Sequence, residues 1–174
     1  AARIPDGADP VEVAPILCAG VTVYKGLKMT GVRPGEWVTI SGIGGLGHIA
    51  VQYAVAMGMR VIAADIAQEK LDLATKHGAE IVVDASSEDV VERVRELTDG
   101  AGADVVYDSV GRSTFDESLR ATRVRGTVVL SPGRTEPIEK YFEAVDDFRR
   151  RGFAVLAHDW RGQGLCDRPL PDRL

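Results

Sequence analysis

Short apolar segments alternate with amphipathic helical patterns over most of this sequence, and this alternation restricts the fold more than any other feature. The segments are rich in Val and Ile and almost continuously apolar, which is typical of strands that helices cover on both faces. They lie at residues 37–42, 60–65, 80–84, 103–108, 126–131 and 153–158. The helical patterns lie at about residues 47–58, 68–77, 87–98, 113–123 and 138–151.

Six strands that alternate with five helices predict an α/β fold. Short loops and right-handed crossovers would produce a three-layer, doubly wound, parallel six-stranded sheet of the Rossmann type. No linker or low-complexity tract divides residues 1–174, so we expect a single Rossmann-like domain. Before the first strand, a short turn capped by Asp9 should precede a helix that Pro15 opens and that ends near Gly31.

A glycine-rich turn joins the first of these strands to the next helix. Gly42 permits the sharp turn, Gly44 lets the backbone approach a pyrophosphate, and Gly47 lets the helix pack closely on the strand. The N–H groups and the dipole at the helix start favour phosphate oxygens. Together with Gly45 and Leu46, these glycines form the predicted pyrophosphate site. The alternative, a turn of this kind without a ligand, is disfavoured because strand, turn and helix all agree.

An acidic residue, Asp65, ends the following strand 18 residues after Gly47. A carboxylate at this place accepts hydrogen bonds from the adenosine ribose hydroxyls and repels a 2′-phosphate. Arg60 begins the strand instead of following it, so it is poorly placed to neutralise such a phosphate. The sequence therefore predicts NAD rather than NADP.

Charge and cysteine content exclude several other classes of protein. A formal net charge of -5 argues against nucleic-acid binding, which needs a basic face. Cys18 and Cys166 lie far apart, so neither a disulfide framework nor a zinc knuckle is expected. No apolar run approaches 18 residues and no signal segment is recognisable, which predicts a cytoplasmic protein without a membrane partner.

From Ile4 to about Ala85 the sequence resembles the medium-chain, zinc-dependent alcohol dehydrogenases, and the resemblance runs through residues 16–24, the glycine turn, Asp65 and Lys70. The resemblance implies that Thr22 lies beside the nicotinamide and that Asp65 and Lys70 contact the adenosine ribose. It also matches Cys18 with one ligand of the catalytic zinc.

The other zinc ligands of that family come from an N-terminal domain that this sequence does not contain. A catalytic zinc normally needs three protein ligands, so no zinc is expected and Cys18 should be a half-buried helix residue. No catalytic residue is predicted. The expectation is a catalytically incomplete domain that binds NAD(H) weakly.

Later segments resemble other families. Residues 105–111 and 125–129 are similar to the quinone-oxidoreductase branch of the same superfamily, which implies cofactor contacts by Val110 and Gly111. From about residue 131 the sequence resembles the lysophospholipase and monoacylglycerol-lipase group of α/β-hydrolases. No G-x-S-x-G elbow follows, and the neighbours His158 and Asp159 would point to opposite faces of a strand, so no hydrolase site is expected.

This order of resemblances suggests an engineered chimera, dehydrogenase-like over about residues 1–130 and hydrolase-like over about 131–174; a natural gene fusion is the alternative. Besides NAD(H) binding, two functions stay open: residual alcohol or quinone reduction, and a fold that binds no ligand. A last strand at the sheet edge would expose Phe153, Val155 and Trp160 and favour a homodimer, and residues 161–174 are expected to be loosely ordered.

Overall fold

A single six-stranded sheet organises the computed structural model, which describes residues 4–111, 113–130, 142–150 and 154–157. The strands are β1 (Trp37–Ser41), β2 (Arg60–Asp65), β3 (Ile81–Asp84), β4 (Ala103–Asp108), β5 (Thr122–Leu130) and β6 (Ala154–Ala157). The helices are α1 (Pro10–Val13), α2 (Val21–Met29), α3 (Gly47–Ala56), α4 (Gln68–Lys76), α5 (Val90–Leu97), α6 (Phe115–Ala121) and α7 (Phe142–Arg150). The predicted order of strands and helices is confirmed.

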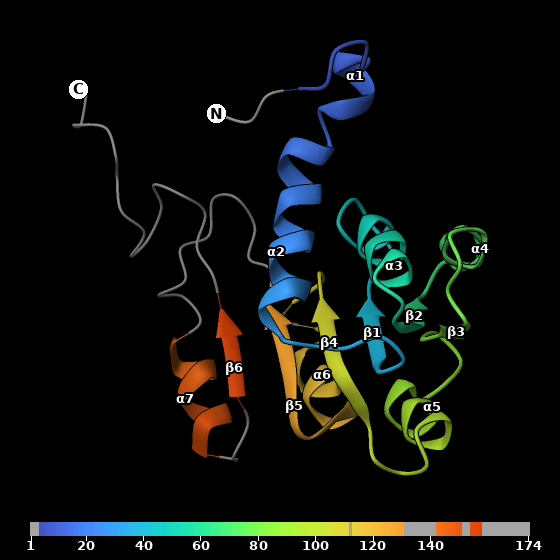
Figure 1. The fold of residues 1–174 in the computed structure, drawn as a ribbon. Helices are drawn as coiled ribbons and strands as arrows, with labels where there is room; N and C mark the ends of the chain where they lie inside the picture. Colours follow the sequence, from blue (N-terminus) through green and yellow to red (C-terminus); the bar gives the residue numbers. More distant parts are fainter. Residues whose placement is uncertain (1–3, 112, 131–141, 151–153, 158–174) are drawn as a thin grey trace.

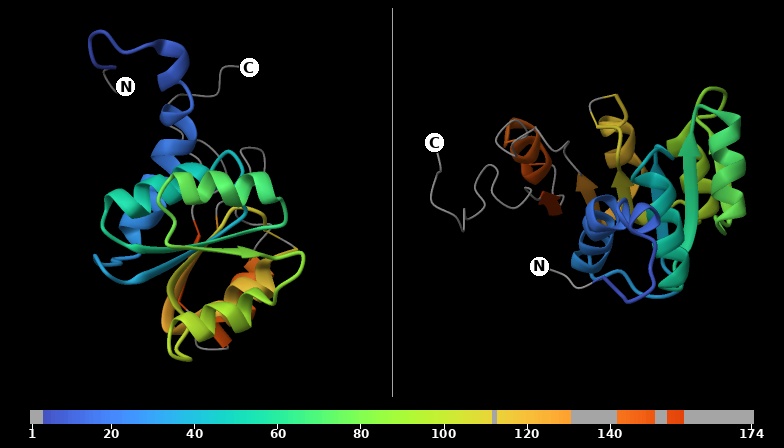
Figure 2. Two further views of the ribbon diagram at one scale, coloured as in Figure 1. Left: turned by 90° about the vertical axis from the view of Figure 1, so that its right-hand side faces the viewer. Right: turned by 90° about the horizontal axis from the view of Figure 1, so that it is seen from above.

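The sheet is parallel throughout and has the strand order β3-β2-β1-β4-β5-β6. Helices α2, α3 and α4 cover one face, where Val23, Ile49 and Ala74 belong to one core cluster. Helices α5 and α6 cover the other face, where Val90 and Val94 of α5 and Ala121 of α6 belong to a second core cluster (Figures 1 and 2). This confirms the three-layer, doubly wound architecture. The strand order reverses between β1 and β4, and such a reversal opens a crevice at the carboxyl ends of the strands.

The N-terminal helix differs from its prediction. Asp9 caps α1 by accepting a hydrogen bond from the Val11 backbone N–H (2.8 Å), and a π-helical turn, η1 (Ile16–Gly20), then leads into α2. The helix predicted from Pro15 to near Gly31 is present as η1 and α2 without a gap, and it differs from the prediction in the π-helical form of its first turn.

By length and composition, the helical stretch Pro10–Met29 is apolar enough to cross a membrane, although it contains no uninterrupted apolar run of 18 residues. The core helix of a folded domain passes the same test. Val23 and Leu27 of α2 are fully buried against the sheet, and burial of each such side chain contributes about 1.5–3 kcal/mol.

Strand β5 begins four residues before its predicted start at residue 126 because of an irregular pairing with β4. Between the pairs Ala103–Thr122 and Val105–Thr127 the chain advances two residues on β4 and five on β5. Within the extra residues Arg125 has a φ of 65°, in the left-handed region that favours glycine.

Replacing Arg125 with glycine should stabilise the protein. A residue with a Cβ in this conformation destabilises the fold by roughly 1–2 kcal/mol, and glycine removes this strain. Part of the stabilisation is lost because glycine has more conformational freedom in the unfolded chain. We expect the free energy of unfolding, measured by urea denaturation, to rise by about 0.5–1 kcal/mol. The control is Val124→Gly, next to it and 87% exposed, which should destabilise; equal effects of the two substitutions would contradict the argument.

Candidate dinucleotide-binding site

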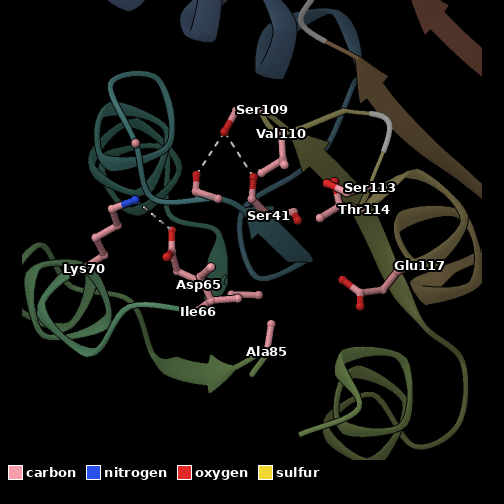
Figure 3. Close-up of a pocket in the computed structure, with 13 residues that line it drawn as sticks. Ser41, Asp65, Ile66, Lys70, Ala85, Ser109, Val110, Ser113, Thr114 and Glu117 are labelled. Carbon is pink, nitrogen blue, oxygen red and sulfur yellow. Dashed lines mark hydrogen bonds and ion pairs between the residues drawn. The ribbon is translucent and has the colours of Figure 1, made fainter. Parts of the chain in front are cut away.

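A hollow of about 420 Å³ lies at the carboxyl ends of the strands, beside the point where the strand order reverses (Figure 3). Its lining comes from the ends of β1 and β2, from the segments that follow β3 and β4, and from α4 and α6. Five of the predicted site residues line it: Gly42, Gly44, Asp65, Lys70 and Val110. The fold thus brings the glycine turn, the acidic residue and the quinone-oxidoreductase-like segment to one place.

The glycine turn is held by close backbone packing. Gly42 has a φ of 81°, and its N–H donates to the Ala64 carbonyl (2.8 Å). A Cβ on Gly47 would lie only 1.8 Å from the Gly42 carbonyl oxygen, so α3 begins almost in contact with the end of β1. Both glycines are therefore required by the backbone itself, whatever the turn binds.

Gly44 has a different environment. A Cβ on Gly44 or Gly45 would meet no atom within 4 Å, so the backbone faces open space. Among the described residues the N–H groups of Gly44 and Gly45 donate no hydrogen bond, and Leu46 is the residue that precedes α3. Free N–H groups at the start of a helix fit the oxygens of a pyrophosphate.

Asp65 is 8% exposed and joins the glycine turn to the next loop. Its carboxylate accepts hydrogen bonds from the backbone N–H of Ile43 (2.7 Å) and of Ala67 (3.0 Å). The Lys70 Nζ atom lies 3.8 Å from Asp65 Oδ2, as the dashed line in Figure 3 marks. The negative charge at this end of the hollow is thus fixed in position and partly balanced.

The segment after β4 is anchored by two polar side chains. The Ser109 hydroxyl donates to the carbonyl oxygens of Gly42 (2.9 Å) and Ser41 (3.1 Å), which ties this segment to the glycine turn. The buried carboxylate of Asp108 accepts from the backbone N–H of Val110 (2.9 Å) and Gly111 (2.8 Å). Gly111 thereby helps to fix the loop without lining the hollow itself.

Eight lining residues had no predicted role, among them Ile66, Ala85 and Glu117. Ile66 is 72% exposed directly after Asp65, and the carboxyl end of a parallel strand is a signal that could have identified it. Glu117 lies on α6, and burial together with the charges of Asp89 and Asp108 raises the pKa of its carboxyl group, against the opposing effect of Arg120.

Thr22 and Cys18 lie outside this group of residues. Thr22 is buried on α2 and its hydroxyl donates to the Cys18 carbonyl (2.8 Å), and it does not line the hollow. Cys18 is exposed, so the prediction that it is half-buried is wrong; it lies at the surface of the π-helical turn. Within the described residues no three His, Cys, Asp or Glu side chains gather to hold a metal ion, so these residues do not fit a catalytic zinc.

Comparisons with known proteins show the family to which the chain belongs. A family model described as zinc-binding dehydrogenase matches residues 45–161. The chain is 51% identical over 129 residues to an alcohol dehydrogenase of Geobacillus stearothermophilus, a match that covers 74% of this chain and 38% of that protein. The chain therefore spans about two fifths of that relative's length.

Solved structures with the same architecture are also known. A quinone oxidoreductase of Pseudomonas syringae pv. Tomato DC3000 superposes with a TM-score of 0.76 at 29% identity, covering 90% of this chain and 49% of that one. The Escherichia coli quinone oxidoreductase complexed with NADPH superposes with a TM-score of 0.74 at 30% identity, covering 91% and 48%. None of the three proteins named is a hydrolase, and the family model continues to residue 161, so the hydrolase-like or engineered origin of residues 131–174 stays a prediction.

Proposed function

This chain belongs to the zinc-binding dehydrogenase family, and from that premise we propose that it binds NAD(H) in the hollow beside the glycine turn. The open backbone at Gly44 carries the proposal, because it leaves room for a pyrophosphate against unpaired N–H groups. The adenosine ribose would reach Asp65 and Lys70, and the adenine would lie between the exposed apolar side chains of Ile66 and Val110. The nicotinamide contact of Thr22 stays a prediction.

Selectivity for NAD over NADP is the finer part of this proposal. Asp65 is buried and negatively charged where a 2′-phosphate would approach, and Lys70 already lies beside that carboxylate. The NADPH bound to the Escherichia coli relative makes the measurement informative, because both cofactors have to be considered in this superfamily.

Calorimetric titration with NAD and NADP tests this proposal directly. We expect NAD to bind at least about tenfold more tightly, which corresponds to about 1.4 kcal/mol. The dissociation constant for NAD should be nearer millimolar than micromolar, because the side chains of Ile66 and Val110, which line the hollow, are themselves largely exposed to water. Asp65→Asn removes the charge but keeps an acceptor oxygen, and it should reduce the preference to less than about threefold.

Asp72→Asn is the matched control for this substitution. Asp72 is exposed on α4, where it accepts a hydrogen bond from Gln68 (2.8 Å), and it does not line the hollow. The control should keep the preference of the unchanged protein. Equal or tighter binding of NADP by the unchanged protein would refute the role given to Asp65.

A second candidate function is quinone reduction by bound NADH, which the similarity to the two quinone oxidoreductases favours. The hollow contains Asp65, Lys70 and Glu117 as its ionisable lining residues, and none of them is proposed as a catalytic group. Oxidation of NADH, followed by the loss of its absorbance with quinones and aldehydes under conditions of confirmed cofactor occupancy, separates the two functions; turnover would show catalysis in addition to binding.

Cytoplasmic location, the homodimer and the loose C-terminal segment stay predictions. β6 lies at the edge of the sheet in the described part of the chain. The side chains of residues 153, 155 and 160, on which the dimer prediction depends, and residues 161–174 lie outside what the structure describes.

A further inference from the structure

We propose that Glu117 recognises the base of the bound dinucleotide: its carboxylate accepts a hydrogen bond from the exocyclic amino group of adenine. This inference rests on the proposed function and adds a specificity-determining residue to the same site. It predicts that the protein distinguishes adenine from a purine that carries oxygen at C6.

The position of Glu117 follows from the order of groups along the hollow. Asp65 and Lys70 lie at one end, where the ribose would be held, and Glu117 lies across the hollow from them (Figure 3). Ile66 and Val110 lie between as apolar lining for a flat base. A base that is attached to this ribose and extends across the hollow has its outer edge next to α6.

The carboxylate of Glu117 is free to accept a hydrogen bond. Among the described residues it makes neither a hydrogen bond nor an ion pair, whereas Asp65 and Asp108 each accept several. Burial and the neighbouring charges of Asp89 and Asp108 raise its pKa, against the opposing effect of Arg120, so the ionised group would be stabilised by a hydrogen bond. An incoming N–H donor would supply one.

The chemistry of the purine then sets the preference. Adenine carries an amino group at C6, which donates to a carboxylate. Hypoxanthine carries a carbonyl oxygen there, and two acceptors at hydrogen-bond distance repel each other. A hydrogen bond to a charged group contributes enough free energy to make the dissociation constants of the two dinucleotides differ by about tenfold or more.

Titration with NAD and with nicotinamide hypoxanthine dinucleotide at pH 8 tests this assignment. The unchanged protein should bind NAD about tenfold or more tightly than the hypoxanthine analogue. Glu117→Gln should bring the two dissociation constants within about threefold, because an amide can accept from an amino group or donate to a carbonyl. Glu117→Asp keeps the charge but shortens the reach, and it should also lose most of the discrimination.

Asp116→Asn is the matched control, because it removes the charge of the preceding residue on α6, which is exposed and does not line the hollow. It should keep the discrimination of the unchanged protein, and thermal unfolding verifies that each variant is folded. Equal binding of both dinucleotides by the unchanged protein, or an unchanged ratio in Glu117→Gln, overturns the role of Glu117. Failure of the unchanged protein to bind either dinucleotide overturns the proposed function itself.

Discussion

Replacing Gly44 with valine should abolish NAD binding and leave the fold intact. A Cβ at this position points into open space and meets no protein atom within 4 Å, so the folded protein has room for the new side chain. The same space is where the pyrophosphate would approach the free N–H groups at the start of α3, and the isopropyl group would fill it. We expect the heat of NAD binding to disappear in calorimetry at concentrations where the unchanged protein is saturated.

The series Gly44→Ala and Gly44→Val separates obstruction of the site from damage to the fold. Affinity should fall with side-chain size, from a partial loss with alanine to a complete loss with valine. The thermal unfolding midpoint should stay within a few degrees of the original, because a Cβ at this position meets no protein atom within 4 Å. Retention of full NAD affinity by the valine variant would refute the assignment of this turn to the pyrophosphate.

Gly47→Ala, three residues further along the same turn, should instead destabilise the fold severely. Its Cβ would lie 1.8 Å from the carbonyl oxygen and 2.8 Å from the carbonyl carbon of Gly42, and both atoms belong to the backbone. To relieve this steric clash, α3 must move away from the end of β1, and this movement disturbs the core beneath the helix. We expect a loss of about 3 kcal/mol or more, hence a fall of the unfolding midpoint by roughly 6–12 °C.

The comparison with Gly44→Ala makes this prediction specific. Both substitutions add the same methyl group to the same glycine turn, and only the one at Gly47 meets backbone atoms. Similar unfolding midpoints for the two variants in calorimetric scans would show that the close approach of α3 to β1 is not as tight as described.

Sequence periodicity predicted most of the fold because each strand and helix has a local signal. Val and Ile at consecutive positions specified β2, β3 and β4, and the three glycines marked the turn between β1 and α3. The early start of β5 had no such signal. Thr122 directly follows α6 and pairs with Ala103 across the sheet, so only the neighbouring strand determines its conformation.

Most of the predicted residues that line the hollow follow a strand end, but Ile66 at such an end was missed, and so was Glu117, which tertiary packing places at the hollow. Gly42, Asp65 and Val110 lie at the carboxyl ends of strands, and the fold brings them to one hollow. Glu117 lies in the interior of an ordinary helical pattern, and only the packing of α6 turns it toward that hollow. Thr22 was predicted from resemblance alone, and it does not line the hollow.

The hydrogen bond from Ser109 to the Gly42 carbonyl has a consequence for the order of events during synthesis. It joins residues 67 positions apart, and the β1–β4 pairing beneath it spans the same separation. Contacts between such distant residues form slowly, because a long loop must close before any of them can stabilise the chain. As the nascent chain leaves the ribosome, β1, α3 and β2 therefore emerge well before the strand that completes the crevice. Dinucleotide added to ribosome-bound chains should thus protect them from proteolysis only after the segment around Ser109 has emerged.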